Sequence, residues 1–372
     1  MKFSKILIED IERRISENNS FDTIVERLKN ARRIGIWGTG LAGTIIFEAL
    51  RRLNINVEFF MDNDLKRLKN FACKGNRIIE NIRDIPSDTL VIIACNVIYG
   101  VHNQLEEVGH KEYLYIDPGV IYYHRKDYDI TEIIKKNSGK IDEVYEILAD
   151  DDSRKVYKNV LLHRAVHDLN LIWDIYDKNQ YFGNRVIRQA KGCFVDCGAF
   201  QGDTLRQFLK QVGNQRYKYF AFEADHDNYQ ILKQYCEKYC LKEVYPINLG
   251  VWNKKEQLFF QSNSITGEVA GKISDIEKEG MAVSADSIDH VLADIETDFI
   301  KMDIEGAEIK ALEGAKETIL KNEPVLAISA YHELEHLWEI PIWIKEINSK
   351  YRIYFGHHMW NAADTVCYAL MK

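Results

Sequence analysis

A group of acidic side chains follows one short apolar segment late in the sequence. The segment Phe299–Asp303 has the composition of a buried strand, and Glu305 and Glu308 come directly after it, around a Gly-Ala pair that suits the start of a helix. Ligands of open α/β sheets bind where parallel strands end, so acids at this point are well placed to contact one. Such carboxylates take up protons or bind divalent cations, while the simpler interpretation is that they stabilise a helix amino terminus.

A glycine-rich segment earlier in the chain forms a second group. Asp196 ends a predicted strand, and Gly198 and Gly202 let a ligand approach the backbone next to the amino terminus of a helix. About twenty residues further on, Glu223 ends the next strand, where a carboxylate accepts hydrogen bonds from ribose hydroxyls. Together the two features predict a nucleoside-bearing ligand, and they do not distinguish a dinucleotide from S-adenosylmethionine (SAM). The simpler interpretation is a glycine turn beside an ordinary surface glutamate.

A series of predicted strands positions both groups. The strands are Cys193–Cys197, Tyr217–Glu223, Val244–Asn248, Phe299–Asp303, Val325–Ser329, Tyr351–Phe355 and Thr365–Leu370. Helical patterns separate the first five, and a loop joins the last two as in an antiparallel hairpin. This order suits the methyltransferase variant of the doubly wound α/β fold.

The amino-terminal part has the same succession of strand, glycine turn and helix. Gly38, Gly40 and Gly43 form G-x-G-x-x-G after the predicted strand Arg33–Trp37, and Asp62 follows the next strand. This context meets the requirements of a dinucleotide fingerprint, although the domain is short for a complete dinucleotide fold. Three interpretations stay open: a nucleotide or nucleotide-sugar site, an NAD(P) site, or a structural or oligomerising domain that keeps the glycine turn.

The chain is therefore expected to hold two Rossmann-like, doubly wound α/β domains. Residues 1–125 form the first, with one or two amphipathic helices in residues 1–30 and further strands at Val57–Met61, Leu90–Ala94 and Tyr113–Ile116. Residues 126–190 show helical periodicity and are predicted to be a helical linker. Residues 191–372 form the second domain, with the seven strands of a SAM-dependent methyltransferase fold.

Three motifs of the second domain occur in a recognisable order. The glycine-rich loop, the segment Asp286-Ser287-Ile288-Asp289 and the segment Met302–Glu308 correspond to DxGAxxGxxT, DSxD and MDxEGAE. In this order they resemble the FkbM-type family of SAM-dependent methyltransferases. The resemblance extends over residues 192–370, and its most specific part is the last of the three segments.

The resemblance implies methyl transfer from SAM to a hydroxyl oxygen of a sugar or glycan, in surface polysaccharide or natural-product biosynthesis. A hydroxyl is a weak nucleophile and needs a base, for which Asp303 and His332 are the candidates, with Glu305 orienting the acceptor. We predict no bound metal, although the oxygen-rich group suits a divalent cation. The predicted cofactor contacts are Asp196, Gly198, Ala199, Gly202, Thr204, Glu223, Gly250 and Asp303.

One motif points to a different chemistry. His332-Glu333-Leu334-Glu335-His336 is H-E-x-x-H, the zinc-protease pattern. That chemistry needs both histidines on one face of a continuous helix, whereas His332 directly follows a predicted strand and Pro341 comes soon after His336. We therefore do not predict a protease. Two further alternatives stay open: an NAD(P)- or nucleotide-sugar-dependent enzyme acting through the amino-terminal domain, and a non-catalytic scaffold of a glycan assembly.

The composition limits the partners. Among 372 residues, 57 Asp and Glu outnumber 49 Lys and Arg, which disfavours general binding of nucleic acid. The apolar segments are far shorter than the roughly 20 residues of a membrane-spanning helix. An odd number of cysteines, seven, spread over strand-like segments indicates a reduced, cytoplasmic protein. The expected partners are a small sugar or glycan acceptor and, optionally, further copies of the chain in a homo-oligomer.

Overall fold

The computed structural model describes residues 2–16, 21–72, 75–95, 98–116, 129–182, 192–213, 215–262, 271–274 and 281–371. Contacts divide the chain into two compact units. Unit 1 comprises Met1–Gly139, Lys158–Tyr176 and Met359–Ala362, and unit 2 comprises Lys140–Tyr157, Asp177–His358 and Ala363–Lys372. The expected domain boundaries near residues 125 and 190 lie outside the described residues.

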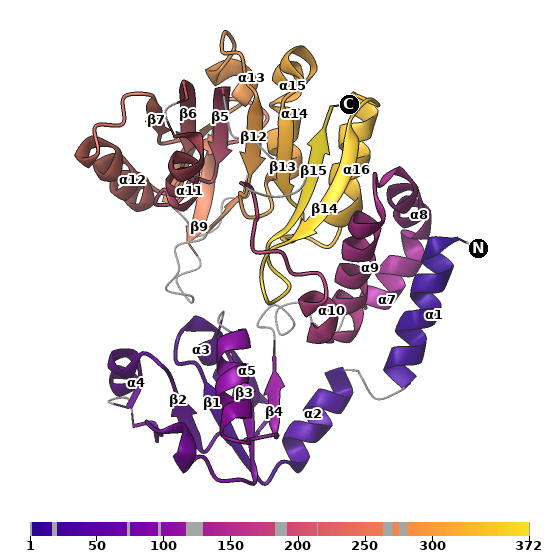
Figure 1. The fold of residues 1–372 in the computed structure, drawn as a ribbon, viewed down its shortest axis with the longest axis vertical. Helices are drawn as coiled ribbons and strands as arrows, with labels where there is room; N and C mark the ends of the chain where they lie inside the picture. The colour runs from indigo at the N-terminus through magenta and orange to yellow at the C-terminus, as the bar shows by residue number, and fades with distance from the viewer. Residues whose placement is uncertain are drawn as a thin grey trace. The chain divides into compact units, whose positions relative to one another are not determined.

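Unit 1 is built on a four-stranded parallel sheet in the order β2-β1-β3-β4 (Figure 1). Its strands are β1 (Arg33–Trp37), β2 (Phe59–Met61), β3 (Thr89–Ile93) and β4 (Tyr113–Tyr115). Its helices up to β4 are α1 (Phe3–Ser16), α2 (Phe21–Asn30), α3 (Leu41–Arg52), α4 (Leu65–Ala72), the 3-10 turn η1 (Ile82–Asp84) and α5 (Ile98–Glu107). The strands predicted from the sequence are confirmed, each to within two residues at either end.

The sheet of unit 1 is covered on both faces, as its continuous apolar strands require. On one face Ile36 and Ile92 lie in a core with Leu50 of α3. On the other face Ile93 packs in a second core with Val101 of α5. All five residues of β3 are buried. A parallel strand enclosed in this way loses the alternation of polar and apolar residues, which explains the unbroken apolar run Leu90–Ile93.

Helices follow in the segment that the sequence predicts to be helical. They are α7 (Ile130–Lys136), α8 (Ser138–Ile147), α9 (Asp151–Val166) and α10 (Leu169–Trp173). The side chains of Asp129 and Asp168 accept hydrogen bonds from backbone N–H groups at the starts of α7 and α10, as helix caps do. The division between the two units passes through α9. In the described part of the chain, no helix combines the length and apolar composition that crossing a membrane requires.

Unit 2 contains a seven-stranded sheet in the order β14-β15-β13-β12-β5-β6-β7 (Figure 1). Its strands are β5 (Gly192–Cys197), β6 (Tyr217–Phe222), β7 (Val244–Ile247), β12 (Phe299–Met302), β13 (Val325–Ser329), β14 (Arg352–His357) and β15 (Thr365–Leu370). β15 runs antiparallel to its two neighbours, and the other pairs are parallel. The predicted strands and the closing hairpin are confirmed.

Helices connect the strands of this sheet and cover it. They are α11 (Asp203–Val212), α12 (His226–Lys238), α13 (Ile288–Val291), α14 (Glu308–Glu313), α15 (Lys316–Asn322) and α16 (His336–Ile347). Stacked aromatic rings form much of the core, with the ring of Phe194 4.4 Å from that of Phe299 and 5.0 Å from that of Tyr219. Because β5, β6, β12 and β13 are parallel, their carboxyl ends share one edge of the sheet, where the predicted site residues gather.

A small second sheet in unit 2 was absent from the sequence prediction. It contains β8 (Gly250–Val251), β9 (Glu256–Ser262), β10 (Gly271–Ser274) and β11 (Met281–Asp286) in the order β10-β9-β11-β8. Along β11, Val283 and Ala285 are buried while Ala282 and Ser284 are exposed. Half-polar strands of this kind give a much weaker pattern than the buried strands of the main sheet.

Candidate active site

The loop after β5 depends on two glycines with left-handed backbone, Gly198 at φ +81° and Gly202 at φ +84°. A Cβ atom on Gly198 would lie 1.9 Å from the carbonyl oxygen of Asp303, so only glycine lets the loop pack against the end of β12. The backbone N–H groups of Gly198 and Ala199 donate to the carbonyl of Phe222. Gly202 precedes α11 and has no side chain to cap it, which leaves first-turn N–H groups for a ligand.

Asp196 lies beneath this loop and is fully buried. The hydroxyl of Tyr219 donates to its Oδ2 over 2.5 Å, and the ammonium of Lys301 lies 3.0 Å from its Oδ1. Lys301 also donates to the carbonyl of Gly198 over 2.8 Å. Burial alone would lower the pKa of Lys301, but the carboxylates of Asp196 and Asp303 raise it above its ordinary value, so it stays charged. Asp196 therefore supports the loop Gly198–Gly202, named the donor loop from here on, from within the fold.

Glu223 follows β6 and faces the same loop. Its Oε2 accepts a hydrogen bond from the backbone N–H of Phe200 over 2.7 Å, and its Oε1 accepts one from that of Asp225 over 2.8 Å. Burial raises its pKa to about 7. Each carboxylate oxygen has a second lone pair, so Glu223 keeps acceptor capacity for the two hydroxyls of a ribose. The carboxylate of Glu223 is thus a suitable acceptor for the ribose hydroxyls of a nucleoside.

The other predicted cofactor residues lie near this loop or in the small sheet. Thr204 is buried in the first turn of α11. Gly250 belongs to β8 and pairs with Ala285 of β11. In the DSxD segment, Asp286 accepts a hydrogen bond from the backbone N–H of Ser287 and lies 2.8 Å from His290 Nδ1. This segment closes the start of α13 and so has a structural role in the small sheet.

The acidic group and His332 meet at the ends of the neighbouring strands β12 and β13. His332 Nδ1 lies 2.8 Å from Oε1 of Glu308. On the other side of the ring, His332 Nε2 lies 3.5 Å from Oδ1 of Asp303 and 3.6 Å from Oε2 of Glu305. The hydroxyl of Tyr331 donates to Asp303 Oδ1 over 3.1 Å. The structure therefore brings together all three predicted catalytic side chains.

Burial and charge set the protonation of this group. Burial alone would lower the pKa of His332, but the carboxylates of Glu308, Asp303 and Glu305 raise it to about 9. For Glu308, burial opposes ionisation, but the imidazole of His332 outweighs it and lowers the pKa. Burial raises the pKa of Glu305. The carboxylates around His332 thus favour the protonated form of its imidazole.

Sequence reasoning missed three residues of this site. Lys301 is the partner of Asp196, and a lysine inside an otherwise apolar strand was the available signal. Tyr331 contacts Asp303 directly. Asp364 precedes β15 in the left-handed conformation, at φ +56°. Burial, and then the nearby charge of Asp303, raise the pKa of Asp364 to about 7. No sequence signal linked Asp364 to the site, because it comes from a distant loop.

The histidines of the H-E-x-x-H pattern do not share a helix. His332 lies in the turn after β13, and His336 is the first residue of α16. Pro341 itself lies inside α16, which runs from His336 to Ile347. The proline lies within the first two turns, where it removes only one intrahelical hydrogen bond.

The glycine loop of unit 1 is also set by backbone packing. Gly38 has φ +122°, and a Cβ there would lie 2.1 Å from the carbonyl oxygen of Ala94. A Cβ on Gly43 would lie 1.8 Å from the carbonyl oxygen of Gly38. Asp62 Oδ2 accepts hydrogen bonds from the backbone N–H and hydroxyl of Thr39. A Cβ on Gly40 would lie 3.1 Å from a guanidinium nitrogen of Arg67.

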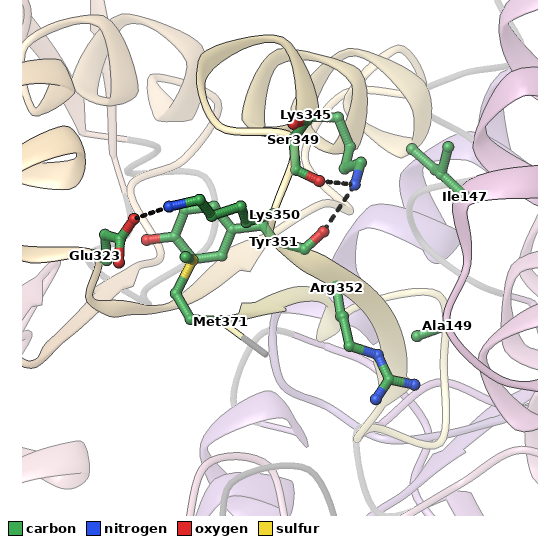
Figure 2. Close-up of a pocket in the computed structure, with 9 residues that line it drawn as sticks. All are labelled: Ile147, Ala149, Glu323, Lys345, Ser349, Lys350, Tyr351, Arg352 and Met371. Atoms are coloured by element: carbon green, nitrogen blue, oxygen red, sulfur yellow. Dashed lines mark hydrogen bonds and ion pairs between the residues drawn. The ribbon is translucent and has the colours of Figure 1, made fainter.

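A large cavity of unit 2, about 820 Å³, lies away from these residues (Figure 2). It adjoins the start of β14 and the residue after β15, which is the edge opposite to the carboxyl ends of β12 and β13. Figure 2 shows Lys350 paired with Glu323, at 3.6 Å, and Lys345 donating to the carbonyl of Tyr351. Its basic groups are thus largely engaged within the protein, and no predicted site residue lines it.

Comparisons with known proteins agree with this geometry. The family model of the methyltransferase FkbM domain matches residues 196–359. The fold is similar to that of a methyltransferase FkbM from Methylobacillus flagellatus KT, with TM-score 0.71, 19% identity and 98% of each chain covered. A comparison with curated proteins gave no match.

Weaker likenesses include an rRNA methylase from Streptococcus thermophilus, 12% identical with TM-score 0.32, covering 56% of this chain and 95% of that one. A SAM-dependent methyltransferase from Aquifex aeolicus is 17% identical with TM-score 0.31, covering 55% and 99%. The family match covers the glycine loop, Glu223, the acidic group and His332. The chain therefore carries a methyltransferase FkbM domain over residues 196–359.

Proposed function

We propose that the protein transfers a methyl group from SAM to a hydroxyl oxygen of a sugar or glycan acceptor. One observation carries the proposal: the donor loop and the acidic group share a backbone contact. A Cβ on Gly198 would lie 1.9 Å from the carbonyl oxygen of Asp303, so the end of β12 directly adjoins the loop. A carboxylate this close to the donor loop is placed to act on an acceptor there.

On the donor side, Glu223 would hold the ribose hydroxyls and the loop Gly198–Gly202 would hold the amino-acid part. Lys301 fixes the loop through Asp196 and the carbonyl of Gly198, which keeps its shape before a ligand arrives. Bound SAM supplies a methyl group made electrophilic by the adjacent sulfonium. The acidic surroundings of the site suit that positive charge.

On the acceptor side, Asp303 is the residue assigned to take the hydroxyl proton. Its side chain is 24% exposed, against 7% for His332, so an acceptor reaches it more readily. Tyr331 holds Oδ1 of Asp303, which leaves Oδ2 for the acceptor. Glu305 lies on the same side of His332 and would orient a second hydroxyl. Paired hydroxyls are a feature of sugars, which favours a glycan or sugar intermediate as acceptor.

Calorimetric titration with SAM, S-adenosylhomocysteine, NAD and NADP tests the donor assignment. We expect SAM and S-adenosylhomocysteine to bind and Glu223→Ala to weaken SAM binding by about 1–3 kcal/mol. Incubation with methyl-labelled SAM and a panel of sugars, nucleotide sugars and glycans then tests the acceptor class. Label in an ether-linked methyl of a sugar supports the proposal. Binding of NAD(P) without SAM would refute it and move attention to Gly38–Gly43.

A further inference from the structure

Strand pairing brings Asp364 into the active site. β15 runs antiparallel to β13 (Figure 1), and the backbone N–H of Ala330 donates to the carbonyl of Thr365 over 2.8 Å. Continued by one residue, this register sets Asp364 opposite Tyr331, whose hydroxyl donates to Asp303. Burial, and then the charges of Asp303 and Asp364, raise the pKa of Tyr331 well above its ordinary value. Asp364 therefore lies beside the base, at the carboxyl ends of β12 and β13.

A buried hydroxyl faces the same acids. Tyr181 is 2% exposed and packs in a core cluster with Ala199 of the donor loop and Val366 of β15. Among the described residues, its hydroxyl has no hydrogen-bond partner. Burial, and then the charges of Asp303 and Asp364, raise the pKa of this hydroxyl well above its ordinary value. Buried hydroxyls are normally satisfied, so this one indicates a polar group of a ligand beside the two acids.

The negative charge at this point exceeds the positive charge around it. The carboxylates on the acceptor side are named the acceptor acids: Asp303, Glu305 and Asp364. Within the described residues, the ion pairs of the first two are with His332 alone, at 3.5 and 3.6 Å. That imidazole lies closer, at 2.8 Å, to a different carboxylate, that of Glu308. The lysine beneath the donor loop is paired with a carboxylate of its own. The sulfonium of bound SAM supplies one positive charge, which leaves the acceptor acids in excess.

We propose that the acceptor is an amino sugar, whose protonated amine lies between Asp364 and Tyr181 while Asp303 takes the proton of a neighbouring hydroxyl. An ammonium donates up to three hydrogen bonds, and a carboxylate with a phenol oxygen accepts two of them. The ammonium also supplies the positive charge that the acceptor acids lack. The inference rests on the proposed function and narrows its acceptor to sugars with a free amine.

The charge on the amine decides which atom is methylated. A protonated nitrogen has no lone pair, so it does not attack the methyl group. Asp303 takes the hydroxyl proton as the oxygen bonds to the methyl carbon, and the carbon–sulfur bond breaks with its electron pair left on sulfur. The products are the methyl ether with its ammonium unchanged, S-adenosylhomocysteine and protonated Asp303.

Matched sugars test the proposal with the full chain and methyl-labelled SAM. Glucosamine, galactosamine and the glucosamine trimer are each compared with their N-acetylated and their plain hydroxyl counterparts. The members of a set differ only in bearing an ammonium, an amide or a hydroxyl at the same carbon. We expect kcat/KM for the amines to exceed that of their counterparts by about 10-fold to 100-fold, the scale of a charged hydrogen bond. The label should lie in an ether.

Variants separate this role from a structural one. Asp364→Asn and Tyr181→Phe should each remove most of the preference for amines, through a higher KM. Asp294→Asn is the matched control and should keep the preference, because Asp294 is exposed between α13 and β12, at the opposite end of β12 from Asp303. Tyr181→Phe keeps the buried ring, so it tests the site even if Asp364→Asn fails to fold.

Each outcome decides between the two proposals. Ether label in the amines, with the preference reduced in Tyr181→Phe and kept in Asp294→Asn, supports the amino-sugar acceptor. Equal labelling of amines and plain sugars, or a preference that survives both site variants, overturns it and leaves methyl transfer to sugars standing. Label on nitrogen also overturns it. A protein that binds SAM but labels none of these sugars refutes the proposed acceptor class, and this inference falls with it.

Discussion

In unit 1 the loop after β1 packs against the end of β3, and in unit 2 the loop after β5 packs against the end of β12. A Cβ on Gly38 would meet the carbonyl of Ala94 at 2.1 Å, and one on Gly198 would meet that of Asp303 at 1.9 Å. The two glycines thus solve the same packing problem, in which a loop crosses close to the neighbouring strand. The glycine pattern alone therefore indicates this turn, and it does not indicate which ligand binds next to the turn.

The acid that follows the next strand makes the same hydrogen bonds in both units. Asp62 accepts from the backbone N–H of Thr39, and Glu223 accepts from that of Phe200, both over 2.7 Å. In each unit the second carboxylate oxygen accepts from the backbone N–H two residues after the acid. The acid of a dinucleotide-like fingerprint therefore has a structural partner in both loops, which weakens it as evidence for a ligand.

The two units differ beneath and beside the loop. The pair Asp196 and Lys301 of unit 2 corresponds to the apolar pair Ile36 and Ile92 of unit 1, which face each other in the same register. The strand end that carries Asp303 in unit 2 carries Ala94 in unit 1. An apolar pair supports a glycine loop equally well, so the buried ions of unit 2 are explained by chemistry at its strand ends and not by the fold.

Asp303→Asn removes the clearest difference between the strand ends and should have the largest effect. The amide cannot take the acceptor proton, so methyl transfer should fall by about 100-fold to 10,000-fold, with SAM affinity nearly unchanged. Initial rates with labelled SAM and calorimetric titration measure the two quantities separately. Near-wild-type transfer in this variant would remove Asp303 as the base.

Lys301→Met leaves the carboxylate of Asp196 buried without its cation and should cost about 3–5 kcal/mol of stability. A triple variant with Asp196→Leu and Tyr219→Phe imitates the apolar support of unit 1 and leaves no buried hydroxyl without a partner. It should recover most of the lost stability, because replacing a whole buried ion pair is commonly neutral. Chemical unfolding of the variants checks this. A triple variant no more stable than Lys301→Met would show that the two loops need different support.

Gly198→Ala and Gly38→Ala place the same methyl group at equivalent points of the two loops. Each inserts a Cβ about 2 Å from a backbone carbonyl, and each should cost about 1–3 kcal/mol. Only Gly198→Ala should also abolish SAM binding. Thermal unfolding and SAM titration of both variants test this difference. Loss of SAM binding in Gly38→Ala would mean that unit 1 contributes to the donor site.

The sequence predicted the strands of both main sheets because buried parallel strands leave uniform apolar runs, as in Leu90–Ile93 and Val325–Ile328. It also named Asp303 and His332 as candidate bases, and the two meet because residues that follow adjacent parallel strands share an edge. It did not predict Lys301 or Asp364. Their roles depend on contacts with strands and loops that are distant in the sequence, and a single sequence does not show which segments are in contact. The small sheet was missed because a strand such as β11 alternates buried and exposed residues.

The smallest predicted effect concerns the pH dependence of SAM affinity. Burial raises the pKa of Glu223 to about 7, from an ordinary value of 4.5. Between these values the folded protein keeps a proton that the unfolded chain has lost, so this residue's contribution to stability falls as pH rises through the window. SAM binding has the opposite trend, because the ionised carboxylate is the better acceptor for ribose hydroxyls. From pH 6 to pH 8 the affinity should rise about 10-fold.

Calorimetry across this range measures the trend, and Glu223→Gln is the control, because an amide does not titrate and should give a weak, flat profile. A flat profile in the wild type would mean that Glu223 does not change charge on this scale or does not contact the ribose. Asp62 forms the same loop contact in unit 1, so Asp62→Asn should leave the profile of the wild type intact. A flat profile of SAM affinity against pH in Asp62→Asn would contradict this expectation. It would mean that unit 1 contributes to SAM binding, and the two loops would then resemble each other in ligand binding as well as in structure.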